Sequence, residues 1–112
     1  MRIDIRAAAD GFVLLCDGET AAECSARICG PFGECAAIEL RVLPEWRRKG
    51  MGKKLLSHTL RNMRARGCKN AVAELAEDDT AARRFYEKFG FTERKTAVSR
   101  NDAARVIYTI DF

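Results

Sequence analysis

Apolar and polar positions alternate through the first 43 residues, in short runs separated by turn-forming residues. The runs cover residues 2–8, 12–16, 22–29 and 35–43, and Gly, Pro or Asp stands at each break. In the last run Ile38 and Leu40 share one face, and Glu39 lies on the other, as the two-residue period of a strand requires. The pattern therefore predicts four strands joined by tight turns.

A helical period replaces this alternation after Pro44, which ends the fourth strand. Apolar positions then recur at the spacing of one helix face, with basic and polar residues opposite. The sequence predicts a helix over residues 51–66, capped by Gly67. His58 lies off the apolar stripe and is predicted to be a surface residue. The stripe consists of Leu55, Leu56, Thr59, Leu60 and Met63.

The carboxyl-terminal part predicts a strand over residues 71–76, a helix over residues 80–88, and closing strands over residues 91–96 and 105–112. Asp79 is a suitable N-cap for that helix and Gly90 ends it. The predicted order is β-β-β-β-α-β-α-β-β. This indicates an α+β (α/β) fold with one mixed, mostly antiparallel central sheet flanked by helices, in a single domain spanning residues 1–112.

Composition narrows the class of protein. The 112 residues are 47% hydrophobic and 32% charged, without a run long enough to span a membrane, so no membrane partner is expected. The start is charged at alternate positions, unlike a signal peptide. The five cysteines lack zinc-site spacing and His58 is the sole histidine, so no metal is expected. Reduced thiols and a cytoplasmic location are predicted.

Charge is unevenly distributed along the chain. Residues 41–69 carry ten Lys or Arg side chains and one acidic residue, Glu45, whereas acidic residues predominate in residues 1–40. A polyanionic ligand would suit the basic middle, and a cationic ligand would suit the acidic front.

A basic, glycine-containing turn joins the fourth strand to the helix. Gly50 and Gly52 remove side chains where backbone amides must approach a ligand, and the first amides of a helix have no internal partner. With the positive charges of Arg47, Arg48, Lys49 and Lys53, this turn predicts a pyrophosphate site. A Walker loop is excluded, because Arg47 stands where that motif needs glycine.

This turn resembles the acyl-CoA motif of the GCN5-related N-acetyltransferase (GNAT) family. The matching residues are Arg47-x-x-Gly50-x-Gly52, after a strand that ends in Val42-Leu43-Pro44-Glu45. Residues 79–91, with Tyr86 and the closing Gly90-Phe91, resemble the second motif of the family. The resemblance covers about residues 35–112. It implies the acyl-CoA N-acyltransferase fold, acetyl-CoA as acyl donor and an amine acceptor, either a small molecule or a protein.

The resemblance also assigns residues to the cofactor. Backbone groups of Val42 and Leu43 would pair with the pantetheine arm, and the turn would hold the pyrophosphate. Asp79 stands where the family usually has an Asn that contacts the pantetheine, and an ionised carboxylate cannot donate that hydrogen bond. The implied cofactor-binding set is Val42, Leu43, Arg47, Arg48, Lys49, Gly50, Met51, Gly52, Lys53 and Asp79.

Two residues are candidates for catalysis. The resemblance places Tyr86 near the thioester sulfur as general acid; the alternative is an aromatic that packs its helix on the sheet. An ammonium acceptor must lose a proton before direct attack in a ternary complex, and Glu39 is the candidate base. Its alternative is a solvated carboxylate or an ion pair with Arg41.

One departure from the family concerns the acceptor side. The family usually has two helices between its first and second strands, and residues 7–11 leave room only for a turn. The acceptor cleft is then either open or completed by a second subunit, and a homodimer is expected. Glu77, Asp78 and Asp79 follow the fifth strand, and together with the acidic front they predict a cationic amine such as a polyamine, a lysine side chain or an amino sugar.

Two other classes of function remain in view. A non-catalytic acyl-CoA-binding module would share the glycine turn but would need neither Glu39 nor Tyr86. A nucleic-acid binder could use the basic helix, but the sequence lacks a helix-turn-helix signal and a pattern of exposed aromatics. No nucleic-acid partner is therefore predicted.

Overall fold

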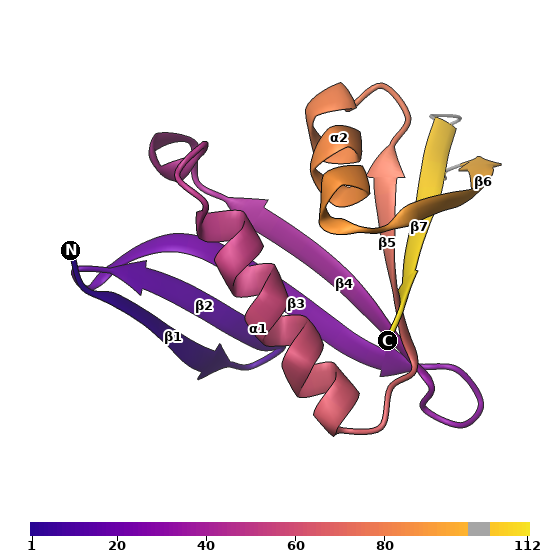
Figure 1. Cartoon of the computed structure of the whole chain (residues 1–112), viewed down its shortest axis with the longest axis horizontal. Coiled ribbons are helices and arrows are strands. Elements are labelled where there is room, and N and C mark those ends of the chain that lie inside the picture. Colours follow the sequence, from indigo (N-terminus) through magenta and orange to yellow (C-terminus); the bar gives the residue numbers. More distant parts are fainter. Residues whose placement is uncertain (99–103) are drawn as a thin grey trace.

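Seven strands form one sheet in the computed structural model, which describes residues 1–98 and 104–112 (Figure 1). Their order across the sheet is β1-β2-β3-β4-β5-β7-β6. The strands are β1 (Ile3–Ala8), β2 (Gly11–Cys16), β3 (Glu19–Cys29), β4 (Cys35–Val42), β5 (Asn70–Ala76), β6 (Thr92–Val98) and β7 (Ala104–Asp111).

The sheet is mixed, as predicted. Among the strand pairs in the described ranges, β4 and β5 alone run parallel, and the other five pairs are antiparallel. The chain passes from β4 to β5 through a short 3-10 helix, η1 (Pro44–Trp46), and then α1 (Met51–Ala65). It passes from β5 to the closing hairpin through α2 (Thr80–Phe89). The predicted element order is confirmed, with η1 as an addition.

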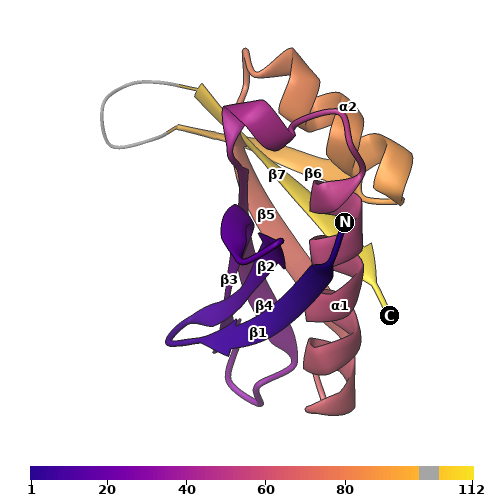
Figure 2. The ribbon, with the colours of Figure 1, turned by 90° about the vertical axis from the view of Figure 1, so that its left-hand side faces the viewer.

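Both helices pack on the same face of the sheet (Figure 2). The apolar stripe of α1 packs on β2, β3 and β4, and the α2 residue Phe85 lies near Gly52 of α1. Leu14 and Tyr108, from opposite ends of the sheet, are fully buried beneath them. None of the helices in the described part of the chain is long and apolar enough to cross a membrane.

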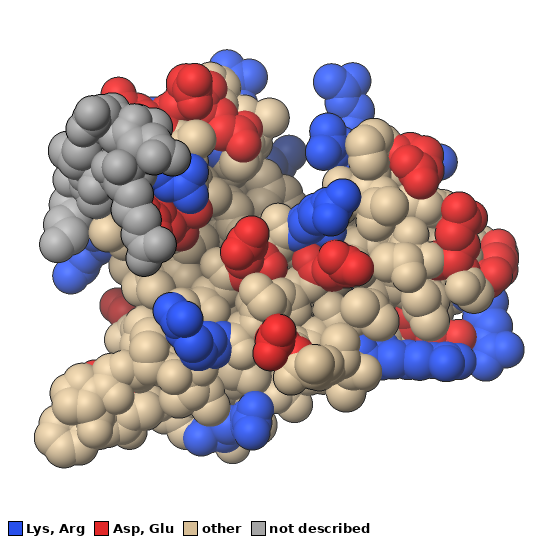
Figure 3. Space-filling view, turned by 180° about the vertical axis from the view of Figure 1, so that it is seen from behind, with Lys and Arg blue, Asp and Glu red and all other residues tan. Residues whose placement is uncertain are grey.

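Among residues 1–98 and 104–112, no helix lies on the opposite face of the sheet (Figure 2). A tight turn at Ala9 and Asp10 joins β1 to β2, and the Asp10 carbonyl accepts a hydrogen bond from the Ala26 amide at 2.7 Å. The prediction that two family helices are missing here is therefore confirmed. Figure 3 views this face, on which acidic and basic side chains are scattered among uncharged ones.

Some details differ from the sequence-based expectations. His58 is half-buried, and its ring packs edge-on against Phe12 with centroids 4.7 Å apart, so the prediction of a surface histidine was wrong. β3 begins at Glu19 rather than residue 22, because a register shift between Leu14 and Leu15 lets Glu19 pair with Cys16. A helical-wheel argument cannot reveal Phe12, which reaches His58 only through the tertiary fold.

Candidate active site

The parallel strands β4 and β5 separate part-way along their length (Figure 1). Their ladder joins Cys35–Ile38 to Asn70–Ala73 and ends there, although both strands continue. β4 keeps its partner β3 on its other side as far as Val42. The backbone of β4 beyond Ile38 therefore faces a gap that has no strand partner among the described residues.

The direction of the β4 backbone groups follows from one hydrogen bond. The Leu43 amide donates to the Ala21 carbonyl at 3.0 Å, so Leu43 faces β3. Because direction alternates along a strand, Leu40 and Val42 direct their amides and carbonyls into the gap. The Val42 carbonyl accepts a hydrogen bond from Arg47 Nε at 3.2 Å. The sequence predicted that the backbone groups of Val42 and Leu43 pair with the pantetheine arm. Those of Val42 face the gap, and the amide of Leu43 does not. The backbone groups of Leu40, which the sequence reasoning did not name, also face the gap.

The basic turn leads directly into the start of α1. Gly50 is its N-cap with φ of 78°, and no side chain caps this end. The first helical hydrogen bond joins the Lys54 amide to the Gly50 carbonyl at 3.1 Å, so the amides of Met51, Gly52 and Lys53 precede it. Such amides, together with the helix dipole, favour an anion. The local geometry suits the predicted pyrophosphate site.

The two glycines of the turn have different roles. Gly50 needs its positive φ, and a Cβ there would meet nothing within 4 Å. Gly52 is buried, and a Cβ there would lie 3.0 Å from Val42 Cγ2 and 3.4 Å from Leu40 Cδ2. Gly52 therefore allows the helix to pack closely on β4. From the sequence alone, the glycine at this position was explained by the close approach of a ligand.

Positive charge surrounds this helix start. Arg47, Arg48, Lys49 and Lys53 are exposed, and the Lys49 ammonium lies 5.2 Å from the centroid of the Trp46 ring. Arg48 has a φ of 64°, an uncommon conformation for a residue with a side chain. Several cations beside free helical amides make a site suited to phosphate groups.

Tyr86 is the buried residue of α2 and lies beside the gap. It is 4% exposed and packs edge-on against Phe85 and Phe91. Burial raises the pKa of the Tyr86 phenol; nearby Cys24 and Glu39 add to the rise, and a hydrogen bond with the Leu40 backbone opposes it. The phenol is therefore protonated at neutral pH, available to donate a hydrogen bond. Tyr86 also lines a hollow of about 220 Å³, so it both packs and faces the gap.

Glu39 lies at the mouth of the same gap. It is exposed, lines the smaller hollow with Tyr86, and contributes to the raised pKa of that phenol. Within the described part of the chain Glu39 forms no ion pair, with Arg41 or any other residue. The two predicted catalytic side chains therefore border one hollow.

Asp79 serves the helix that carries Tyr86. Its carboxylate accepts a hydrogen bond from the Ala82 amide at 3.1 Å, which confirms the predicted N-cap. Asp79 also lines the smaller hollow. One carboxylate oxygen is thus engaged in capping α2, and the residue still borders the gap.

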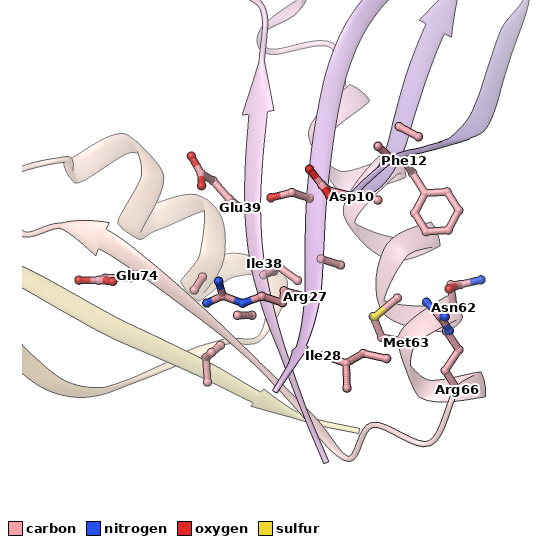
Figure 4. A pocket seen from close by; sticks show the side chains of 18 of the residues that line it. Asp10, Phe12, Arg27, Ile28, Ile38, Glu39, Asn62, Met63, Arg66 and Glu74 are labelled. Atoms are coloured by element: carbon pink, nitrogen blue, oxygen red, sulfur yellow. The ribbon is translucent and has the colours of Figure 1, made fainter. Parts of the chain in front are cut away.

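A larger hollow of about 980 Å³ adjoins the smaller one (Figure 4). The β1–β2 turn, β3, β4, α1, β5 and β7 all contribute to its lining. Four residues border both hollows, namely Ile38, Glu39, Glu74 and Arg105. Glu74 and Arg105 were missed by the sequence reasoning. The signal for Glu74 was its alternation with Ala71 and Ala73, which puts it on the opposite face of β5.

The three acidic residues that follow β5, namely Glu77, Asp78 and Asp79, lie differently with respect to the two hollows. Glu77 and Asp78 border neither hollow. The Glu77 amide donates to the Ala104 carbonyl at 3.0 Å, and its carbonyl accepts from Arg83 Nη1 at 2.9 Å. These two hydrogen bonds hold the connection between β5 and α2 in place. Of the three acidic residues expected near the acceptor, Asp79 alone borders one of the two hollows.

Comparison with known proteins identifies the family. The sequence profile of the Acetyltransferase (GNAT) family matches residues 2–91. The chain belongs to the GNAT acetyltransferase family. This match reaches further toward the amino terminus than the resemblance found from the motifs, which began at about residue 35. No curated protein sequence matches this GNAT chain significantly.

Solved structures share the GNAT fold with this chain. The ribosomal-protein-S18-alanine N-acetyltransferase of Escherichia coli is 23% identical with a TM-score of 0.76, over 90% of this chain and 67% of its own. Ard1 of Thermoplasma volcanium is 20% identical with a TM-score of 0.83, over 91% and 70%. YncA of Salmonella typhimurium, solved with its cofactor acetyl-CoA, is 21% identical with a TM-score of 0.79, over 89% and 62%.

The GNAT chain thus spans about two thirds of the length of these structures. The predicted fold, the family and acetyl-CoA as the acyl donor of the family are confirmed. Within residues 1–98 and 104–112, no three His, Cys, Asp or Glu side chains are grouped so that they could hold a metal ion.

Proposed function

We propose that this GNAT chain transfers the acetyl group of acetyl-CoA to a primary amine by direct attack in a ternary complex. The observation that carries the proposal is the meeting of Glu39 and Tyr86 around one hollow, at the point where β4 and β5 separate. A free carboxylate and a protonated phenol on either side of a gap are the groups that proton removal and thiolate release require.

The residues around the gap fit the cofactor. The helix-start amides of Met51, Gly52 and Lys53, with the charges of Arg47 and the neighbouring cations, would hold the pyrophosphate. The gap-facing backbone groups of Leu40 and Val42 would pair with the pantetheine arm as an added strand would. Bound there, acetyl-CoA supplies an acetyl group activated as a thioester.

Glu39 would act on the acceptor. An alkylammonium has a pKa of about 10.4 and must lose a proton before its nitrogen can attack. The exposed Glu39 carboxylate would take this proton, directly or through a water molecule, and release it to solvent. The nitrogen then bonds to the acetyl carbon as the carbon–sulfur bond breaks. A second proton leaves the nitrogen, and the sulfur gains one, so that charge balances.

Tyr86 would act on the departing sulfur. A thiol has a pKa of about 8.5, well below the raised pKa of this buried phenol, so complete transfer of the phenol proton is unfavourable. We infer that Tyr86 chiefly donates a hydrogen bond to the negative charge that develops on sulfur. This refines the general-acid role that the family resemblance implies.

Binding is tested first. Trp46, the single tryptophan, adjoins the basic turn, so its fluorescence gives a signal beside isothermal titration of acetyl-CoA. Lys53→Gln removes a charge at the helix start and should weaken binding. Arg64→Gln removes one near the other end of α1 and is the matched control. Equal affinities in both variants, or no binding to wild type, would contradict the cofactor site.

Turnover is tested next with acetyl-CoA and three acceptors: spermidine, a lysine-containing peptide and a peptide with amino-terminal alanine. The last follows the name of the Escherichia coli structure. Glu39→Gln and Tyr86→Phe should each lower kcat by about 10²-fold, the scale of one proton-transfer or charge-stabilising group. Glu23→Gln, an exposed carboxylate on β3, is the control. Tight acetyl-CoA binding without acetyl transfer to any acceptor would favour the alternative, a non-catalytic acyl-CoA-binding module.

A further inference from the structure

We propose that the outer face of α1 binds the phosphate backbone of a duplex nucleic acid, in addition to the cofactor held at the start of the helix. This face carries a basic stripe, which consists of Lys53, Lys54, Arg61 and Arg64. All four side chains are exposed. Binding of this kind is a further function, and it does not depend on the acetyl transfer proposed above.

The basic stripe follows α1 from its first turn to its last. With about 100° of rotation per residue, its four members fall within an arc of about 100° on the side of the helix away from the sheet. At a rise of about 1.5 Å per residue, the stripe extends for about 16 Å along the helix axis. Figure 2 shows α1 as an outer layer on its side of the sheet, so an extended ligand can reach this face along its length.

The charges of the basic stripe are not balanced by the described part of the chain. No Asp or Glu occurs in the sequence between Glu45 and Glu74. Within residues 1–98 and 104–112, no member of the stripe forms an ion pair, whereas Arg83 of α2 pairs with Glu93 at 2.7 Å. Solvated helix faces ordinarily mix charges of both signs. The outer face of α1 is therefore a continuous positive surface that attracts anions.

The cofactor accounts only for the start of the basic stripe. Arg61 lies about 14 Å along the helix axis beyond Gly52, and Arg64 lies about 18 Å beyond it, so both are far from the turn that would hold the pyrophosphate. The helix dipole favours a cation in the last turn, such as Arg64, but disfavours Lys53 and Lys54 in the first. Positive charge along the whole face therefore indicates an anion as extended as the stripe.

The residues of this face suit a phosphate backbone better than a protein or a bilayer. The exposed large hydrophobic residues of the described chain are Met1, Ile3, Ile28 and Phe32, and none belongs to α1. The apolar side of α1 is buried against the sheet. Protein interfaces depend on buried aromatic or apolar anchors, and helices that bind bilayers insert apolar side chains. Lys and Arg suffice for a phosphate backbone, because their binding releases condensed counterions.

A duplex fits the basic stripe better than a single strand. Proteins that hold single strands stack the bases on aromatic side chains, and α1 contains no Phe, Tyr or Trp. A duplex carries a phosphate charge about every 1.7 Å along its axis, so the stripe faces several phosphates at once. The sequence predicted no nucleic-acid partner because it lacks a helix-turn-helix signal and exposed aromatics. Binding to the backbone needs neither of these, and we expect it to be independent of base sequence.

Fluorescence anisotropy of a labelled duplex tests this binding, with a length of about 20 base pairs so that the duplex stays straight. DNA and RNA duplexes are each titrated with the full chain over a range of salt concentrations. The double variant Arg61→Gln/Arg64→Gln should bind about tenfold to hundredfold more weakly at about 0.1 M salt. Its plot of log K against log salt concentration should be shallower by about 1 to 2, since each phosphate contact contributes about 0.9 to the slope.

The matched control is Arg84→Gln/Lys88→Gln, which removes two exposed positive charges from α2. It should leave the salt slope unchanged. Equal melting temperatures of wild type and both double variants show that all three proteins are folded. Binding of either duplex with these differences supports the proposal, and the preference between DNA and RNA identifies the source of the backbone.

Four outcomes overturn the proposal. Wild type could bind neither duplex, or the two double variants could lose affinity equally. Saturating CoA could displace the duplex completely, which would place the duplex at the pyrophosphate turn and not on the basic stripe. Polyglutamate could bind more tightly than either duplex, which would assign the stripe to an acidic protein segment. Failure of CoA to bind wild type would contradict the proposed acetyl transfer and leave the duplex titrations to decide this proposal by themselves.

Discussion

Gly52 of α1 lies directly against Val42 of β4, so that a Cβ on this glycine would come within 3.0 Å of Val42 Cγ2. The contact brings the start of the helix onto β4, the strand whose backbone faces the gap between β4 and β5. Its geometry predicts an effect on stability that depends on Val42.

Gly52→Ala should lower the free energy of unfolding by about 1 kcal/mol, because overpacking outweighs the gain in helix propensity. In a Val42→Ala background the added methyl group has room, and the same substitution should be neutral or stabilising. Urea unfolding of the two single variants and the double variant gives the coupling energy. If the effects of Gly52→Ala and Val42→Ala on the free energy of unfolding are additive, the contact between the two residues does not limit the packing of α1 on β4.

The capping role of Asp79 and its proposed contact with the cofactor can be tested separately. Asp79→Ala removes the acceptor for the Ala82 amide and should destabilise the protein by about 1 kcal/mol in thermal or urea unfolding. Asp79→Asn keeps a capping oxygen and should stay within about 0.5 kcal/mol of wild type. Because an amide can also donate, Asp79→Asn should bind acetyl-CoA at least as tightly as wild type. Weaker binding by this variant would contradict a pantetheine contact of the family type.

Tyr108 fastens α2 to the sheet. Its buried hydroxyl donates to Glu87 Oε2 at 2.7 Å and accepts from Arg83 Nε at 3.1 Å. Tyr108→Phe should lower the free energy of unfolding by about 1–2 kcal/mol, since hydrogen bonds with charged partners are lost. Glu87→Gln retains an acceptor and should have a smaller effect. If the losses in the double variant simply add, the predicted coupling between Tyr108 and Glu87 is absent.

Stability at alkaline pH should depend on Cys35. Burial raises the pKa of this thiol to about 11, and the neighbouring Cys29 adds to the rise. The unfolded chain therefore loses the Cys35 proton first, at about pH 9, and stability falls as the pH rises toward 11. Below about pH 9 this contribution is fully present.

Urea unfolding under reducing conditions between about pH 7.5 and pH 10.5 measures this dependence. Cys35→Ala lacks the titrating thiol, so its free energy of unfolding should fall less steeply with pH than that of wild type. Cys24 and Tyr86 are also buried and their pKa values are also raised, so the free energy of unfolding of both proteins still falls with pH to some extent. Equal slopes would show that Cys35 does not titrate as described.

Local patterns in the sequence determined the elements and the family. Two-residue alternation, the apolar stripe from Leu55 to Met63 and the cap at Asp79 depend only on neighbouring residues, and the structure confirms each of them. The basic glycine turn likewise combines its charges and free amides within a few residues of chain. A sequence can specify such features because each is a local property of the backbone and its adjacent side chains.

The residues that border both hollows were decided by tertiary structure. Glu74 was one residue in an apparently apolar strand, and only the register with β4 shows that it borders both hollows together with Glu39. The sequence pointed instead to Glu77, whose backbone fastens a turn. The role of Gly52 depends on the packing of α1 on β4, and the direction of the Leu40 backbone groups depends on the pairing of β4 with β3. Register and the packing of distant elements arise from contacts between residues far apart in the chain, and no local pattern encodes where those contacts end.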